Sequence, residues 1–237
     1  MEMLLSVRGE AQRTIAPDYV TLWCALSSTA ASKAEALRSV RAAKDSLISS
    51  LGRLGGVALT VESGRSSLTW SVGSFSTRDE HDFTKVTGSH GPTGRVVADA
   101  NVVVAVRDLE RLDEVSQVLA EAAQLNVSSV SWHVDADNPA WGAVRADAIA
   151  AAIDKGRDYA AALHGVLLKV EHVADVGLLG GDHAGGPHSV NLGYAAAASA
   201  GMDGGAETPS LDPVPQEIRA MVEARFSAAI EALDAPE

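Results

Sequence analysis

The sequence contains few of the residues that would point to a specific chemistry. Cys24 is the only cysteine among 237 residues, which excludes an intrachain disulfide and a cysteine-rich metal cage. Aromatic residues make up only 4% of the chain, so we expect a core of small-residue helices and β-branched strands. Nineteen basic residues against thirty-one acidic ones give a formal net charge of −12. This balance argues against binding to nucleic acid or to an anionic membrane surface.

Long apolar runs are also missing from the sequence. No stretch approaches the roughly 20 apolar residues that a membrane-spanning helix needs. The start of the chain is apolar only at Met3–Leu5 before Ser6 and Arg8, which does not have the form of a secretory signal. These features predict a cytoplasmic protein without a membrane span, and an export signal removed from the mature chain is the alternative.

The local motifs of common enzyme classes do not occur. No Gly-x-Gly-x-x-Gly follows a strand, no phosphate-binding loop ends in Gly-Lys-Ser or Gly-Lys-Thr, and there is no Gly-x-Ser-x-Gly nucleophile elbow. Cys24 alternates with apolar neighbours, which favours a buried, unreactive thiol. Asp182, His183 and His188 could together bind a divalent ion, but a Gly/Pro loop does not position them before binding. We therefore predict no catalytic, cofactor-binding or metal-binding residue.

The remaining ionisable side chains are interpreted as surface groups. The acidic run 79–82 is typical of a solvated loop tip. The third predicted helix carries acidic residues interleaved with basic ones, which indicates a solvent-facing side with ion pairs: Arg145, Asp147, Asp154, Lys155, Arg157 and Asp158. Four of the other histidines are assigned to a polar arm or to polar strand faces: His81, His90, His133 and His172.

Apolar periodicity predicts strands and helices along most of the chain. Alternation at period two indicates strands near residues 5–10, 19–28, 57–61, 68–72, 96–106, 130–134, 168–170 and 218–230. Helical spacing with capping residues indicates helices near residues 32–54, 108–122 and 138–163. The segment 218–230 is also rich in Ala and Glu, which favours a helix, but its strict alternation outweighs propensity. Residues 73–93 fit a long hairpin or an irregular arm.

The third helix receives the most specific prediction. Its apolar stripe is expected at Ala146, Ile149, Ile153, Gly156, Ala160 and Leu163. Gly156 lies in mid-helix, where a glycine costs roughly 1 kcal/mol relative to alanine, so we expect close backbone packing to compensate. Gly165 is expected to end this helix in the left-handed conformation.

Together these elements predict an α+β fold of one domain, residues 1–237. A βαββαβ-like core, with an added helix and two strands, would form a mainly antiparallel sheet with helices packed on one face. The segment 178–210, within a longer aperiodic stretch at 177–212, is rich in Gly, Ala and Ser and is predicted to form a loop or arm.

Four segments in chain order resemble one family. They are Ser6-Val7-Arg8-Gly9-Glu10 followed by Ala16-Pro17-Asp18, the strand and helix start at 104–112, the segment 143–149, and the segment 160–166. In this order they are similar to the SIMPL-domain family, which is bacterial and largely uncharacterised. At Ala11 the family usually has a second glycine. The resemblance implies an α+β domain without established catalytic residues, so no functional residue is carried over.

Two functions are consistent with these observations. The first is a non-enzymatic domain that acts through self-association or a protein partner, suggested by the two apolar faces of the strand 19–26 and by the arm at 177–212. A monomer whose apolar faces all pack internally is the simpler alternative. The second is a small-ligand or metal-binding protein or enzyme, with a site under the 73–95 or the 177–212 loop.

Overall fold

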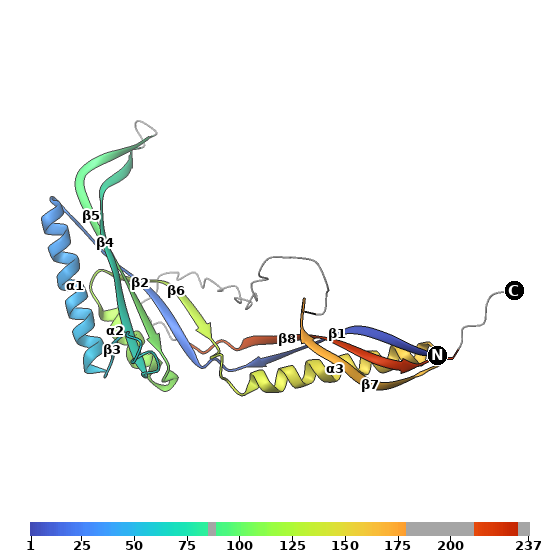
Figure 1. Cartoon of the computed structure of the whole chain (residues 1–237). Helices are drawn as coiled ribbons and strands as arrows, with labels where there is room; N and C mark the ends of the chain where they lie inside the picture. The colour runs from blue at the N-terminus through green and yellow to red at the C-terminus, as the bar shows by residue number, and fades with distance from the viewer. Residues whose placement is uncertain (85–88, 179–210, 232–237) are drawn as a thin grey trace. The chain divides into compact units, whose positions relative to one another are not determined.

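The computed structural model describes residues 1–84, 89–178 and 211–231 (Figure 1). In chain order its elements are β1 (Glu2–Ile15), β2 (Tyr19–Ala30), α1 (Lys33–Arg53), β3 (Val57–Ala58), β4 (Leu68–Thr84), β5 (Ser89–Val106), the 3-10 turn η1 (Leu109–Arg111), α2 (Leu112–Glu121), β6 (Leu125–His133), α3 (Ala140–Ala162), β7 (Val166–Asp175) and β8 (Gln216–Ala229). The α+β class predicted from the sequence is confirmed. The strands divide between two mostly antiparallel sheets.

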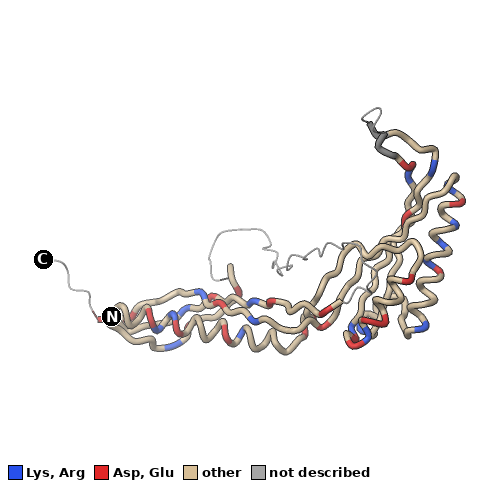
Figure 2. Tube along the Cα trace, turned by 180° about the vertical axis from the view of Figure 1, so that it is seen from behind, with Lys and Arg blue, Asp and Glu red and all other residues tan. Residues whose placement is uncertain are grey.

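The chain groups into two compact units, each built around one of the sheets. Unit 1 comprises Met1–Ala16, Ala136–Ala195 and Pro215–Glu237, and unit 2 comprises Pro17–Asp135 and Ala196–Val214. The predicted arm at 178–210 lies almost wholly outside the described residues. Lys and Arg are interspersed with Asp and Glu along both units (Figure 2). Among helices in the described parts of the chain, none is both long and apolar enough to cross a lipid bilayer.

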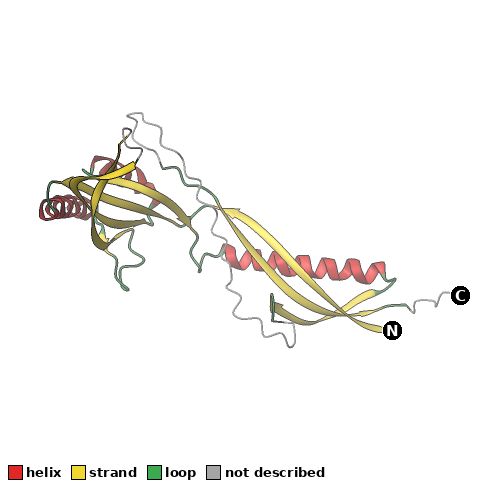
Figure 3. Cartoon of the chain, turned by 90° about the horizontal axis from the view of Figure 1, so that it is seen from above, coloured by secondary structure: helices red, strands yellow, loops and turns green. Residues whose placement is uncertain are grey.

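Unit 1 is a three-stranded antiparallel sheet covered on one face by α3. The strand order is β1-β8-β7, so the segment 218–230 is a strand that lies in the centre of the sheet, as its alternation predicted. Leu5 pairs with Phe226 and Val7 with Ala224, and all four side chains are buried. Figure 3 shows α3 running beside the long strands of this sheet.

Small residues form the face of α3 that contacts the sheet. The buried positions are Val144, Ala148, Ala152, Gly156 and Ala160, spaced every fourth residue. Of the expected stripe, Gly156 and Ala160 are buried, and Ile153 and Leu163 are half-buried against the core of unit 1, whereas Ala146 and Ile149 are exposed. The helix turns its alanines most directly toward the strands. Gly156 packs as predicted: a Cβ there would lie 3.1 Å from the Phe226 ring.

Gly165 follows α3 for a different reason from the one predicted. The left-handed residue is His164, with φ of 51°. A Cβ on Gly165 would lie 2.2 Å from the carbonyl oxygen of Ala229, so glycine is required there by close contact with β8.

Unit 2 is a five-stranded sheet in the order β3-β4-β5-β2-β6, antiparallel except between β3 and β4. Its largest core contains residues of β2, β4, β5, α1 and α2. Val20, Leu22, Cys24 and Leu26 of β2 are buried in this core, whereas Trp23 on the opposite face is 48% exposed. The alternation at period two predicted for this strand, and the burial of Cys24 among its apolar neighbours, are therefore confirmed.

Capping residues and apolar alternation predicted several of the helix and strand boundaries in unit 2. Ser32 caps α1, with its hydroxyl accepting a hydrogen bond from the Glu35 amide at 3.3 Å. The region 73–93 contributes to a long hairpin of β4 and β5, one of the two predicted forms. Three details differ: β3 is only two residues long, β6 begins at Leu125 rather than near residue 130, and Asp108 makes no side-chain cap because the 3-10 turn η1 precedes α2.

Candidate interaction surface

Strand β7 forms one edge of the unit 1 sheet and exposes apolar side chains along its length. It pairs with β8 on one side, and no described residue forms a ladder on its other side. Four of its apolar side chains are between 42% and 63% exposed: Val166, Leu168, Val170 and Val173. An edge strand of this kind is a place where another strand can add, because its outer backbone groups lack a sheet neighbour.

The apolar residues of β7 stay exposed because α3 packs chiefly on β1 and β8. Val170 pairs with Phe226 and Val173 with Ala224, so both lie on the face of the sheet that α3 covers. Phe226 and Ala224 are buried beneath α3, yet their neighbours on β7 remain almost half exposed. The covered face therefore reaches β7 only at Leu167, which packs beside Gly156 of α3, and Val170 and Val173 lie beyond it.

Two β-bulges interrupt the pairing of β7 with β8. The register shifts between Leu167 and Lys169 and again between Val170 and His172. In the ladder, therefore, no residue of β8 is in register with Leu168 or with Glu171. Near these bulges the side chains of Lys169 and Glu171 form an ion pair at 3.2 Å. An edge strand with bulges and a lysine is commonly protected from indiscriminate pairing. Any strand that adds to β7 must therefore match the bulges and the charges.

A second cluster lies in unit 2, where β2 begins and β5 and β6 end. Arg107 donates two hydrogen bonds to Asp135, at 2.6 and 3.1 Å. The Arg107 guanidinium also lies 4.3 Å from the centroid of the Tyr19 ring, which stacks on His133 with 4.6 Å between centroids. The amide of Asp135 donates to the Asp18 carboxylate at 2.7 Å, which ties the start of β2 to the segment after β6.

The electrostatics of this cluster are those of a satisfied ion pair. Hydrogen bonding from Arg107 lowers the pKa of Asp135, and the same bond raises the pKa of Arg107. Burial lowers the pKa of His133, and the positive charge of Arg107 lowers it further. A carboxylate held ionised by its own arginine is a weak proton acceptor, so this arrangement is suited to holding strand ends together.

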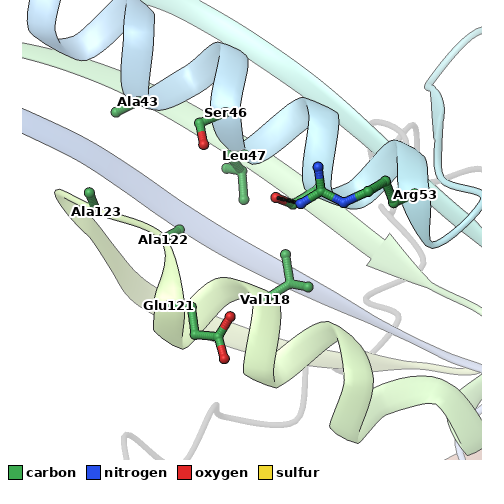
Figure 4. Close-up of a pocket in the computed structure, with 9 residues that line it drawn as sticks. Ala43, Ser46, Leu47, Arg53, Val118, Glu121, Ala122 and Ala123 are labelled. Carbon is green, nitrogen blue, oxygen red and sulfur yellow. Dashed lines mark hydrogen bonds between the residues drawn. The ribbon is translucent and has the colours of Figure 1, made fainter.

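A cleft of about 250 Å³ lies between α1 and α2 (Figure 4). It is lined mostly by small or apolar side chains, with Arg53 at one position and Glu121 at another. Arg53 donates to the Ser50 hydroxyl at 2.8 Å, and Glu121 accepts from Gln117 at 3.0 Å. Its charged groups thus form hydrogen bonds within their own helices and do not converge on a common point. The cleft therefore lacks the convergent polar groups that bind a ligand specifically.

The structure tests several residues that the sequence singled out. Cys24 is 2% exposed, and burial raises its pKa to about 11, as expected for an unreactive thiol. Asp182, His183 and His188 lie outside the described residues. His81 and His172 are exposed, and His133 is half-buried against Tyr19. No group of three metal-ligating side chains occurs in the parts of the chain that the structure describes.

Two predictions about charged segments need correction. The run 79–82 belongs to β4 and does not form a loop tip; there the Glu80 carboxylate accepts a hydrogen bond from Thr93 of β5 at 2.7 Å. The charged side of α3 partly contacts the sheet, because Lys155 donates to the backbone oxygen of Arg8 at 2.7 Å. Arg157 and Asp154 do form the expected ion pair within the helix.

Sequence reasoning did not identify the Arg107–Asp135 pair or the exposed edge of β7. Arg107 and Asp135 are 28 positions apart, and only the pairing of strands brings them together. The signal at β7 was weak but present: the strand contains Val and Leu on both faces, whereas a strand buried on one face would alternate.

Comparison with known proteins gives a family but no function. A search of curated proteins found no match. The family model SIMPL, described as a protein of unknown function (DUF541), matches residues 5–226 and therefore nearly the whole chain. In the structure, the four segments that suggested this family lie in β1 and just after it, from β5 into α2, and at the two ends of α3. The chain belongs to the SIMPL (DUF541) family.

Proposed function

We propose that this chain is a non-enzymatic domain that acts by associating with proteins, and that its first partner is a second copy of the same chain. The observation that carries the proposal is the apolar, unpaired edge of β7. Burying such side chains contributes about 25 cal/mol per Å² of apolar area, and an incoming strand also satisfies outer backbone groups. The four exposed β7 side chains provide the first source, and the outer edge of β7, where no described residue forms a ladder, provides the second.

The ionisable groups with shifted pKa values support a binding role rather than a reaction. The Cys24 thiol is kept protonated by burial, and Asp135 is kept ionised by Arg107. The raised pKa keeps the thiol out of its nucleophilic form, and the lowered pKa makes the Asp135 carboxylate a weaker base.

The alternative function stays a prediction. A ligand, metal or catalytic site under the 73–95 region would have to use the β4–β5 hairpin, and one under 177–212 would involve residues outside those described. A cytoplasmic location and a bacterial source likewise stay predictions from the sequence.

Sedimentation velocity of the full chain over a wide concentration range tests the proposal. We expect the mass to rise above the 24.5 kDa of one chain as concentration increases. Leu168→Asp should weaken this association, because it introduces a charge on the β7 edge. Leu59→Asp is the matched control, since Leu59 is 49% exposed, close to the 54% of Leu168, but lies in unit 2.

Two results together would overturn the proposal. The first is a single-chain mass at every concentration. The second is binding of an apolar dye that Leu168→Asp leaves unchanged, since this would show that the β7 edge offers no accessible apolar surface.

A further inference from the structure

The residues of β7 on the α3 face are symmetric about Val170. The register shifts lie between Leu167 and Lys169 and between Val170 and His172, so the two residues outside the ladder, Leu168 and Glu171, lie two positions before and one position after Val170. Leu167 and Val173 are each three residues from Val170, and all three side chains lie on the α3 face because they pair with alternate residues of β8.

We propose that two copies of the chain associate through β7, paired antiparallel about a two-fold axis at Val170. This inference rests on the proposed function and names its surface and its partner, a second copy. In this register the inward residue Leu167 lies opposite Val173 of the second copy, and Val170 lies opposite its equivalent. Leu168 then lies opposite His172 of the second copy, and Glu171 lies opposite its Lys169.

Charge complementarity selects the same register. Lys169 lies opposite Glu171 of the second copy, and Glu171 lies opposite its Lys169, which gives two cross-strand ion pairs per dimer. Directly opposed charges of opposite sign stabilise antiparallel strands, and like charges destabilise them. Both side chains are accessible, with 67% of Lys169 and 34% of Glu171 exposed.

Neighbouring registers lack this match. An axis at Lys169 would oppose two lysines, and an axis at Glu171 would oppose two glutamates. An axis between two residues would pair side chains of opposite faces, because a shift of one position reverses the faces of a strand. The axis at Val170 therefore combines matched α3 faces with opposite charges, and it joins the two unit 1 sheets into one of six strands, β1-β8-β7-β7-β8-β1. Such an isologous interface is the common basis of dimers.

A charge-exchange experiment tests this register. In Lys169→Glu alone, and in Glu171→Lys alone, both cross-strand pairs bring like charges together, so the dissociation constant of the dimer should rise at least about tenfold. A mixture of the two variants should form mixed dimers, because every cross-strand pair is then opposite in sign. The doubly substituted chain should associate like the original one.

The mixture separates the interface from effects within one chain. Each single variant also loses its internal Lys169–Glu171 ion pair, and mixing cannot restore that pair. Lys44→Glu is the matched control: Lys44 pairs with its neighbour Asp45 in α1 of unit 2, so its loss should leave the mass unchanged. Circular dichroism confirms that each variant is folded.

The outcomes distinguish the two proposals. If the original chain associates but the single variants do so equally well, or the mixture fails to recover, pairing through β7 about Val170 is wrong while association itself stands. If the original chain stays monomeric at every concentration, pairing about Val170 is wrong, and the proposed function fails as well when Leu168→Asp leaves the binding of the apolar dye unchanged.

Discussion

Replacing Gly9 with alanine should destabilise unit 1, because α3 lies too close to β1 for a side chain. A Cβ at Gly9 would be 2.0 Å from the carbonyl oxygen of Ala148 and 2.7 Å from the Cβ of Ala152. Both contacts involve parts of the helix that cannot rotate away. Ordinary van der Waals contact begins at 3.4 Å, so the helix must withdraw from the strand by about the difference, 3.4 − 2.0 = 1.4 Å.

A control variant separates the loss of stability in Gly9→Ala from the general effect of replacing a glycine by alanine. Overpacking a core costs typically about 1–3 kcal/mol, so we expect the free energy of unfolding to fall by that amount in Gly9→Ala. Gly142→Ala is the matched control in the same unit: nothing lies within 4 Å of a Cβ there, and Gly142 belongs to α3. Alanine stabilises a helix relative to glycine by about 0.5–1 kcal/mol, so this variant should be more stable.

Urea unfolding followed by far-ultraviolet circular dichroism measures both variants. The expected order of unfolding midpoints is Gly142→Ala above the original chain and Gly9→Ala below it. If Gly9→Ala unfolded at the same urea concentration as the original chain, the close approach of α3 to β1 would be refuted.

Three further predictions concern unit 2. Cys24 should not react with a thiol reagent at pH 8 until the chain unfolds, since its pKa is about 11; rapid labelling of the folded protein would contradict its burial. Because the folded pKa of His133 is lowered, the unfolded chain binds its proton more readily, so stability should be constant above the unfolded pKa of 6.5 and fall as pH drops below it. His133→Phe keeps a ring against Tyr19 and should lessen this fall between pH 7 and 5; an unchanged pH profile of the urea midpoint would show that His133 does not contribute. Arg107→Lys loses the two hydrogen bonds to Asp135 and should lower the free energy of unfolding by about 1–3 kcal/mol. Arg111→Lys is the control, since Arg111 pairs with Glu114 at the surface. Equal stability of the two variants would show that the Arg107–Asp135 pair does not stabilise unit 2.

Elements with strong local signals could be predicted from the sequence. Alternation located β8 against its helical propensity, and Ser32 correctly marked the start of α1. The buried face of β2 followed from its period of two. These predictions succeeded because the signal and the structure involve the same few consecutive residues.

The packing of α3 and the candidate surface could not be predicted in the same way. Isoleucines have the larger hydrophobic transfer energy, so a stripe through Ile149 and Ile153 was the natural expectation. The structure buries Ala148 and Ala152 instead, because Gly9 on β1 allows the backbones to approach. That approach depends on a residue more than 130 positions away. The exposure of β7 depends on it in turn, since a strand pattern does not show how far a helix extends over a sheet.

The fold of unit 1 and its proposed role therefore share one physical cause. Strands in a sheet are about 4.8 Å apart and a helix with its side chains is about 10 Å wide, so one helix covers about two strands. The contacts of Ala148 with Gly9 and of Gly156 with Phe226 fix α3 over β1 and β8. The third strand is then left with apolar residues that its own helix cannot reach. Covering Val170 and Val173 requires material from outside the described residues of unit 1, and a strand that presents the charges of β7 in reverse order fits that edge best.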